Sequence, residues 1–358
     1  MSTADTRDVI VVGAGGMGQA WLDTIARRAD LRVSAVVDVV EQAAQACIDR
    51  RGLDASAFTD VDQALAAAPA DLLVNVTIPE AHLPVSSASV RAGVPVLTEK
   101  PVTPTVAEAL RLAALSRSRG VLVATSQSRR HARGITAFRD ALRAAGGAEQ
   151  LDAQFFQNPR FGGFRDRMPH PLLVDMAIHT FDQARFVLGT EPVSVYCEEF
   201  NPSWSWYDGA AAAEAVFAFA GGSRFAYSGS WCADGLQTSW NGAWRGSAAG
   251  GTASWDGETD VRTQGRDGDA ASLPLPDADE GLDAALAEFL SALDGGPAPS
   301  GEIHRNIWSL AMVEAAVTSA EQGRRVLLSD IFDEALQTAL RTATEDERDA
   351  LADTEEFS

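Results

Sequence analysis

Three side chains of this 358-residue sequence have the chemistry and the positions to support proton transfer, and the first is Lys100. It is the only lysine, although lysine and arginine together number 29. The apolar run from Val94 to Leu97 predicts a short buried strand just before it, so the ammonium group is expected at the carboxyl end of a strand, where α/β sheets bind ligands. Lysine is a compact charge whose pKa shifts readily on burial, whereas arginine stays charged. Position alone also fits an ordinary surface lysine.

The other two side chains are Asp175 and His179, in a segment from Pro171 to Leu188 that predicts a helix ending at Gly189. Residues four apart share one helix face, so the carboxylate can reach the imidazole. Such a pair suits hydride chemistry on an alcohol, because the hydroxyl proton must leave as the hydride does. The spacing alone favours a core histidine satisfied by a neighbouring aspartate, and only the resemblance described below favours a catalytic pair.

The N-terminal residues predict a dinucleotide-binding motif. A run of β-branched residues, Val9 to Val12, leads into the sequence G-x-G-x-x-G at Gly13 to Gly18 and then into a predicted helix. Glycines there allow a tight turn, close approach of the backbone to a pyrophosphate, and close packing of helix on strand. The next predicted strand ends at Asp38, where a carboxylate can accept hydrogen bonds from the adenosine ribose hydroxyls; an aspartate that caps a turn is the alternative. No basic side chain follows Asp38 to hold a 2′-phosphate, so NAD is predicted over NADP.

The elements that must position these residues predict two kinds of domain. Residues 1–127 alternate strands and helices, which indicates a doubly wound α/β Rossmann domain with five or six parallel strands. Residues 128–330 begin with a helix and continue with strands near 149–157, 192–200, 212–220 and 223–231 and further strands to about 265. Successive strands without helices between them predict an α+β domain with an open, mainly antiparallel sheet. The expected remainder is a loop or hairpin region at 256–271, a helix at 302–322 and an acidic tail at 331–358.

Composition narrows the range of functions. The formal net charge of −21 disfavours binding to nucleic acid or to an anionic membrane, and no apolar run is long enough to span a bilayer. The N-terminus lacks the pattern of a signal peptide, so a cytoplasmic protein is expected. Three widely spaced cysteines, without metal-ligand spacing, predict reduced thiols and no metal site.

The sequence resembles the glucose-fructose oxidoreductase / inositol dehydrogenase / MocA group of NAD(P)-dependent sugar and cyclitol dehydrogenases, over most of residues 8–330. The resemblance rests on the glycine motif, Asp38, the run from Thr77 to His82 followed by Ala92-Gly93, the tripeptide Glu99-Lys100-Pro101, and the D-x-x-x-H segment with Asp182 after it. It implies that Lys100 reaches the substrate hydroxyl and that Pro101 makes a turn that aims the lysine, with a cis Lys100–Pro101 bond. It also implies the roles of Lys100, Asp175 and His179 as catalytic residues.

The candidate cofactor contacts are Gly13, Gly15, Gly16, Met17, Gly18, Asp38, Thr77, Pro79, His82, Glu99 and Lys100, and the candidate substrate contacts are Lys100, Arg130, Asn158, Asp175 and His179. The sequence departs from the family at Ser128 to His131, where many members have asparagine and an aromatic residue, and at Met168 to Pro171. His170 is a candidate pocket residue or a turn histidine. Six tryptophans between 204 and 255 could stack on sugar rings, but core and interface positions are expected for most of them.

These features together predict an NAD-dependent oxidoreductase that transfers a hydride between a secondary hydroxyl of a sugar, cyclitol or glycoside, or the matching ketone, and nicotinamide. Two alternatives remain: an enzyme that cleaves glycosides with the help of bound NAD, and a cofactor-binding regulator without turnover. The open sheet leaves a face to be covered, which predicts a homodimer or homotetramer formed by the second domain.

Overall fold

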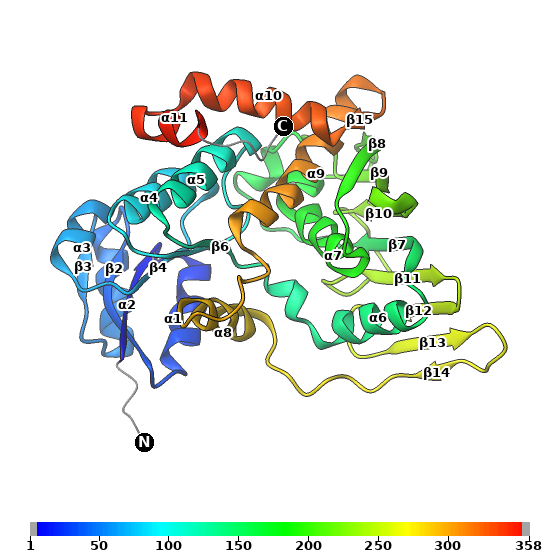
Figure 1. The fold of residues 1–358 in the computed structure, drawn as a ribbon, viewed down its shortest axis with the longest axis horizontal. Coiled ribbons are helices and arrows are strands. Elements are labelled where there is room, and N and C mark those ends of the chain that lie inside the picture. Colours follow the sequence, from blue (N-terminus) through cyan, green and yellow to red (C-terminus); the bar gives the residue numbers. More distant parts are fainter. Residues whose placement is uncertain (1–5, 353–358) are drawn as a thin grey trace. The chain divides into compact units, whose positions relative to one another are not determined.

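The computed structural model describes residues 6–352, which form two compact units (Figure 1). The first unit consists of residues 6–127, 282–307 and 333–352, and the second of residues 128–281 and 308–332. One division between the units falls after Gln127, where the domain boundary is predicted. The sequence assigns residues 282–307 to the second domain, whereas in the structure these residues pack with the N-terminal residues.

A six-stranded parallel sheet forms the centre of the first unit, in the order β3-β2-β1-β4-β5-β6. This is the strand order of a doubly wound fold, with its switch point between β1 and β4. The strands are β1 (Arg7–Val12), β2 (Leu31–Val37), β3 (Ser56–Phe58), β4 (Leu72–Asn75), β5 (Val96–Thr98) and β6 (Val123–Thr125). Their short, nearly continuous apolar runs are buried, as is typical of strands covered by helices on both faces.

Helices connect these strands, and local capping explains several of their ends. They are α1 (Gly16–Ala26), α2 (Glu41–Arg51), α3 (Val61–Ala67), α4 (Pro79–Arg91) and α5 (Val106–Arg119). The side chain of Asp60 caps α3 and that of Thr105 caps α5, each by accepting a backbone N–H bond. Gly52 and Gly120 end α2 and α5 in the left-handed conformation.

The core of the first unit also includes a helix from the far end of the chain. Helix α8 (Gly281–Leu293) buries Leu286, Phe289 and Leu290 against the side chains of β1, β2 and α1. Their i, i+3, i+4 spacing forms one apolar stripe on the helix, which is the pattern of a helix that packs on a sheet. The sequence carries that pattern, but no helix is predicted at these positions.

The last described residues form two helices, α10 (Leu328–Thr342) and α11 (Glu345–Ala352). Helix α11 packs on α5, and Glu347, whose side chain is 2% exposed, forms an ion pair with Arg111 at 2.7 Å. Arg91 binds both Asp346 and Glu347. The predicted tail is therefore an anchored part of the first unit as far as residue 352.

The second unit contains a nine-stranded sheet in the order β14-β13-β12-β11-β7-β10-β9-β8-β15. All neighbouring strands are antiparallel except β7 and β10, which run parallel. The strands are β7 (Ala148–Phe156), β8 (Pro192–Phe200), β9 (Ala212–Phe219), β10 (Arg224–Ser230), β11 (Ala243–Ala248), β12 (Gly251–Trp255), β13 (Val261–Gly265), β14 (Ala271–Ser272) and β15 (Val326–Leu327). The hairpin β13–β14 occupies the predicted loop or hairpin region.

Helices α6 (Arg133–Ala144) and α7 (Ile178–Leu188) pack against this sheet, and α9 (Ile303–Gln322) follows later in the chain. Phe181 of α7 makes edge contacts with the rings of Phe217 and Tyr227 at 4.8 and 5.3 Å between centroids. Trp231, Trp244 and Trp255 are buried in this core, whereas Trp204 and Trp240 are exposed. Short 3₁₀ or π segments complete the unit: η1 (Ser128–His131), η2 (Arg165–Arg167), η3 (Pro171–Ala177) and η4 (Ala220–Gly222).

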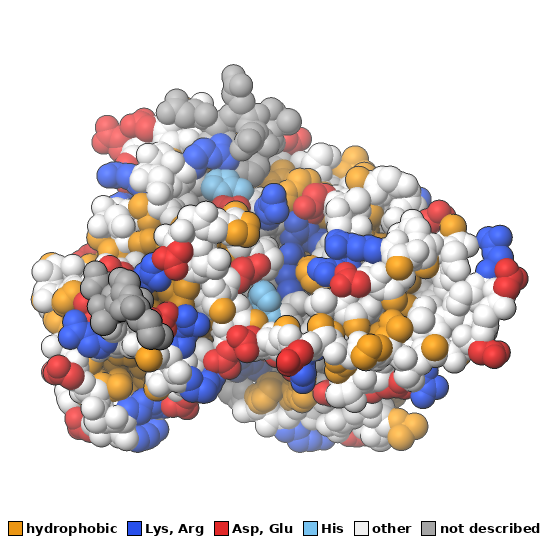
Figure 2. Space-filling model, turned by 60° about the horizontal axis from the view of Figure 1, so that its bottom comes forward, with side chains coloured by type: hydrophobic (Ala, Val, Ile, Leu, Met, Phe, Trp, Pro, Cys, Tyr) orange, Lys and Arg blue, Asp and Glu red, His pale blue; other side chains and the backbone are white. Residues whose placement is uncertain are grey.

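No helix among the described residues has the length and apolar content needed to cross a membrane. Acidic side chains are spread over the whole face of the molecule that Figure 2 draws, as the net charge of the sequence leads one to expect.

Candidate active site

The loop between β1 and α1 contains two kinds of glycine. A Cβ atom at Gly13, where φ is +110°, would lie 2.5 Å from the carbonyl oxygen of Val76, and one at Gly18 would lie 2.0 Å from the carbonyl oxygen of Gly13. A Cβ atom at Gly15 or Gly16 would meet no atom within 4 Å. The first two glycines therefore allow close packing of the backbone, and the other two leave open space at the N-terminus of α1. That space and the helix N-terminus fit a pyrophosphate.

Asp38 lies directly after β2, and its carboxylate connects the β1–α1 loop to the turn that follows β2. Its Oδ2 accepts a hydrogen bond from the backbone N–H of Ala14 at 2.8 Å, and its Oδ1 accepts one from that of Val40 at 2.9 Å. The predicted alternative of a turn-capping aspartate thus describes part of what this residue does. The ribose contact expected for it is compatible with these bonds, because each carboxylate oxygen has a second lone pair. Val39 beside it is 88% exposed and offers no positive charge.

His82 connects the loop after β4 to the turn after β5. The imidazole is buried, with Nδ1 2.6 Å from the carbonyl oxygen of Pro101 and Nε2 3.1 Å from that of Thr77. Burial lowers the pKa of His82. Its side chain therefore acts on the predicted cofactor site through the two loops that it holds together. Pro79 begins α4 at the position where proline is favoured.

Lys100 lies just after the carboxyl end of β5, as predicted, and the Lys100–Pro101 peptide bond is cis. Glu99 before it is bound from two sides: Oε1 accepts the indole N–H of Trp21 at 2.9 Å, and Oε2 accepts the backbone N–H of Lys100 at 3.2 Å. Burial raises the pKa of Glu99. Through Trp21, which belongs to α1, this helix and the lysine turn share one hydrogen-bonded carboxyl group.

A further pair of polar residues, Glu302 and His304, lies at this edge of the sheet and is absent from the sequence predictions. The segment before α9 returns to β6, where the backbone N–H of Thr125 donates to the carbonyl oxygen of Gly301 at 2.8 Å and Ala124 bridges to Glu302. Glu302 hydrogen-bonds His304. The only indication of this arrangement in the sequence is that Gly301 precedes Glu302 and His304, and that indication is weak.

Asp175 and His179 lie on both sides of a change in helix type. Asp175 belongs to η3, a π-helical segment, and His179 belongs to α7, which continues it. The prediction of a single α-helix from Pro171 is therefore wrong for the first two turns. Short π-helical segments within α-helices are frequent at functional sites. His179 is buried, with only 8% of its surface exposed.

The Asp175 carboxylate is held by an arginine from the preceding loop. Arg165 donates from Nε to Oδ2 of Asp175 at 2.7 Å. The guanidinium carbon of Arg165 also lies 5.3 Å from the ring centroid of Phe161 and 4.8 Å from that of Phe164. Both phenylalanines are 56% exposed. One arginine side chain thus links Asp175 to a pair of exposed aromatic rings.

Arg130, a candidate substrate contact, has a structural partner. Its guanidinium forms a bidentate ion pair with Asp182, including a 2.7 Å bond from Nη2 to Oδ1, and both side chains are at most 10% exposed. Ser309 of α9 also donates to Asp182 at 2.6 Å. Asp182, which in the sequence continues the D-x-x-x-H stripe, therefore fixes η1 and α9 to α7.

Asn158, the other candidate from the sheet domain, lies in a polar network at the end of β7. Its side-chain N–H group donates to Asp234 at 2.9 Å, and its carbonyl oxygen accepts from Gln237. His170, directly before η3, has Nδ1 2.6 Å from Glu199 and Nε2 3.5 Å from Glu321. The hydrogen bond to Glu199 raises the pKa of His170. This residue is an ion-paired turn histidine that joins η3 to β8 and α9.

Comparison with known protein families places these features in context. Residues 7–127 match the model of an oxidoreductase family with an NAD-binding Rossmann fold, and residues 150–251 match the GFO/IDH/MocA C-terminal domain. The chain belongs to the GFO/IDH/MocA family. This confirms the resemblance and the fold class expected from the sequence. Among residues 6–352, no three histidine, cysteine or acidic side chains come together as a metal-binding group.

Members of the family that resemble this chain include sugar and cyclitol enzymes. The 1,5-anhydro-D-fructose reductase of Ensifer adhaerens is 26% identical over 88% of this chain and 96% of its own length. An inositol 2-dehydrogenase of Corynebacterium glutamicum is 30% identical over 52% of this chain and 55% of its own. Among solved structures, an oxidoreductase of Agrobacterium radiobacter in complex with NAD+, L-tartaric acid and magnesium superimposes with a TM-score of 0.81 at 16% identity, covering 91% of this chain and 99% of that one. These comparisons support an NAD-binding oxidoreductase.

Proposed function

We propose that this protein is an NAD-dependent dehydrogenase that oxidises a secondary hydroxyl group of a sugar, cyclitol or glycoside, or reduces the matching ketone. The observation that carries the proposal is the placement of two chemical motifs at the ends of regular elements. Lys100 stands at the carboxyl end of β5, and Asp175 and His179 stand at the junction of η3 and α7. The relatives that act on anhydrosugars and inositols support the substrate class.

The residues of the first unit fit NAD. The open space in front of Gly15 and Gly16 accommodates the pyrophosphate, with Gly13, Met17 and Gly18 shaping the loop around it. Asp38 is assigned to the adenosine ribose hydroxyls, and the absence of a neighbouring cation at Val39 supports NAD over NADP. Thr77, Pro79, His82 and Glu99 complete the proposed site as residues of the segments that follow β4 and β5. When bound, the nicotinamide ring accepts or donates the hydride.

Side chains of the protein are assigned to the transfer of the hydroxyl proton and to the stabilisation of the negative charge on the substrate oxygen. We assign His179 as the base that takes the hydroxyl proton, with Asp175 as the carboxylate that orients the imidazole and stabilises its protonated form. The ammonium group of Lys100 stabilises the negative charge that develops on the substrate oxygen. Arg165, which holds Asp175, is a positioning residue. Asn158 remains assigned to the substrate through its exposed amide network.

The test is reduction of NAD, followed at 340 nm, across a panel of aldoses, inositols and their acids. Turnover of at least one polyol with NAD supports the proposal. Bound cofactor that copurifies, with turnover of glycosides in the absence of added NAD, would instead establish the NAD-assisted cleavage of glycosides. Cofactor binding without turnover of any polyol would leave a regulator as the function.

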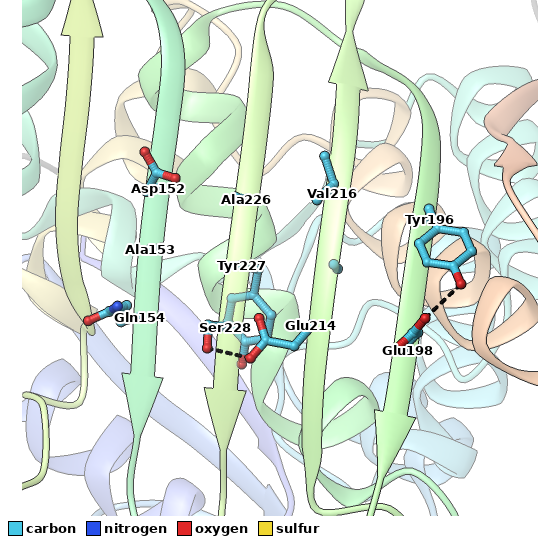
Figure 3. Close-up of a pocket in the computed structure, with 11 residues that line it drawn as sticks. Asp152, Ala153, Gln154, Tyr196, Glu198, Glu214, Val216, Ala226, Tyr227 and Ser228 are labelled. Atoms are coloured by element: carbon cyan, nitrogen blue, oxygen red, sulfur yellow. Dashed lines mark hydrogen bonds between the residues drawn. The ribbon is translucent and has the colours of Figure 1, made fainter. Parts of the chain in front are cut away.

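We also propose that a second copy of the chain covers the free face of the sheet in the second unit (Figure 3). Two rows of cross-strand neighbours line a hollow there: Tyr196, Val216, Ala226 and Asp152 in one row, and Glu198, Glu214, Ser228 and Gln154 in the other. Tyr196 donates to Glu198 and Ser228 donates to Glu214, both at 2.7 Å. Val216 is 44% exposed, and flat, partly apolar sheet faces of this kind are common in isologous interfaces.

Light scattering at micromolar concentration tests this assembly. We expect the mass of a dimer or tetramer for the native chain and a smaller mass for Val216→Lys, whereas Leu236→Lys, an exposed apolar position outside the strands, should leave the mass unchanged. A native monomer would refute the assembly.

A further inference from the structure

Arg129 is an arginine without a counter-charge. Among the residues that the structure describes, no carboxylate lies within ion-pair distance of its guanidinium group. Its contacts are the carbonyl oxygen of Trp240, which accepts from Nη1, and the sulfur of Met176, 3.9 Å from Nη2. The neighbouring Arg130, by contrast, is neutralised by Asp182.

The burial of Arg129 makes the lack of a carboxylate partner energetically unfavourable. Burial lowers the pKa of Arg129 to about 10, because the protein has removed most of the water that would stabilise its charge. Other arginines of this chain at comparable depth have a carboxylate partner: Arg185 binds Glu191 at 2.6 Å and Arg111 binds Glu347 at 2.7 Å. A desolvated, unpaired guanidinium is therefore an exception in this fold. An anion from outside the chain would supply the counter-charge that it lacks.

Arg129 contacts η3, the segment that carries Asp175. Met176, which it contacts, follows Asp175 directly on η3. Trp240, whose carbonyl it binds, is 43% exposed, and its ring centroid is 6.5 Å from that of the exposed Phe161. The guanidinium group thus lies between the side chain of Met176 on η3 and the backbone of Trp240, whose partly exposed ring neighbours that of Phe161.

We propose that Arg129 binds a negatively charged group on the substrate, a carboxylate or a phosphate ester, so that the preferred substrate is an acidic sugar or cyclitol rather than a neutral one. This inference rests on the proposed dehydrogenase function. The planar fork of a guanidinium matches both carboxylate and phosphate oxygens, and aromatic faces such as Trp240 and Phe161 suit the C–H face of a sugar ring.

The experiment compares three classes of probe on the NAD-bound protein. The neutral probes are glucose, galactose and myo-inositol, the carboxylates are glucuronate, galacturonate and gluconate, and the phosphate esters are glucose 6-phosphate and inositol 1-phosphate. Each is measured for turnover and for stabilisation against thermal unfolding. The variants are Arg129→Gln, Arg129→Lys and, as a matched loss of one exposed positive charge, Arg167→Gln.

We expect one anionic class to have kcat/KM at least ten-fold above its neutral parents, and the responding class shows whether the group is a carboxylate or a phosphate. Arg129→Gln should lower kcat/KM for the anionic probe by about 10- to 100-fold, mainly through KM, and should change the values for neutral probes little, since a charge-assisted bond is lost only with the charged group. Arg129→Lys should recover part of the loss, and Arg167→Gln should resemble the native protein. Without ligand, Arg129→Gln should unfold at a temperature no lower than the native chain, because it removes an uncompensated buried charge.

Several results would overturn the assignment of Arg129. They are neutral sugars used as well as acidic ones, an equal loss for both classes in Arg129→Gln, a weakened affinity for NAD in that variant, or a lower unfolding temperature than that of Arg167→Gln. If no probe of any class is turned over, the dehydrogenase proposal fails. The thermal shift by acidic probes, and its loss in Arg129→Gln, then still decides whether Arg129 binds an anion.

Discussion

Two glycines of the phosphate loop should respond in opposite ways to the same substitution. A methyl group added at Gly13 meets the backbone of Val76 at 2.5 Å and also forces alanine to adopt a φ of +110°. Left-handed backbone costs a non-glycine residue about 1–2 kcal/mol, and overpacking against backbone adds about 1–3 kcal/mol. Gly13→Ala should therefore lower the free energy of unfolding by about 2–5 kcal/mol.

Gly15→Ala should instead leave the fold nearly unchanged and weaken cofactor binding. Gly15 has a φ of −71°, which alanine adopts freely, and its added methyl group would meet no protein atom within 4 Å. The change at this N-cap position should cost about 0.5–1 kcal/mol. The methyl group would occupy the space assigned to the pyrophosphate, so NAD affinity should fall at least about ten-fold, or roughly 1.4 kcal/mol.

Urea unfolding followed by circular dichroism and NAD titration followed by fluorescence separate the two effects. Gly52→Ala is a useful control for conformation alone, since Gly52 has a φ of +60° with open space around it and lies at the end of α2. It should destabilise the chain without changing the NAD affinity of the folded protein. Native-like NAD binding by Gly15→Ala would show that the loop does not hold the pyrophosphate as described, and equal loss of stability in Gly13→Ala and Gly15→Ala would contradict the packing described for Gly13.

Three further predictions address the chemistry, the cofactor and the pH dependence. Lys100→Ala and His179→Ala should each reduce turnover by about 10²–10⁴-fold with NAD affinity nearly intact, and the double variant should be little worse than the poorer single one; additive losses would place the two groups in separate steps. Asp38→Ala combined with Val39→Arg should shift the ratio of kcat/KM values from NAD toward NADP, and a native enzyme that already uses NADP equally well would refute the ribose assignment. The raised pKa of His170 means that the folded state favours the protonated imidazole. The stability lost in His170→Gln should therefore be largest below about pH 6.5, the ordinary histidine value, and should shrink as the pH rises through the raised pKa. A difference in urea midpoint that stays constant from pH 5 to 9 would contradict this.

The sequence predicts those parts of the fold whose signals are local. The strands and helices of residues 7–125 follow from buried β-branched runs, helix caps and glycine stops, and the glycine motif, Asp38 and Lys100 stand at the expected ends of their elements. Helix α8 is not predicted because its partners in β1, β2 and α1 are far away in the sequence, so the role of its apolar stripe becomes apparent only in the assembled core.

The site was predicted by residue type but not by pairing. Arg129 and Arg130 are adjacent and chemically identical, and only the position of Asp182 decides which of them is neutralised. Likewise, the sequence from Pro171 to Leu188 is compatible with a continuous α-helix. The π-helical start at Asp175 depends on the packing of that segment and not on its periodicity.

The division of the first unit into three separate stretches of chain has a consequence for biosynthesis. The ribosome releases residues 6–127 long before Leu286, Phe289 and Leu290 of α8, and Glu347 of α11, have been made. Until then, the nascent chain exposes the apolar surface of β1, β2 and α1 that α8 will cover, together with an unpaired Arg111. The Rossmann sheet therefore completes its core only after α8 and α11 have been synthesised, and until then its uncovered apolar surface is open to chaperones and to aggregation.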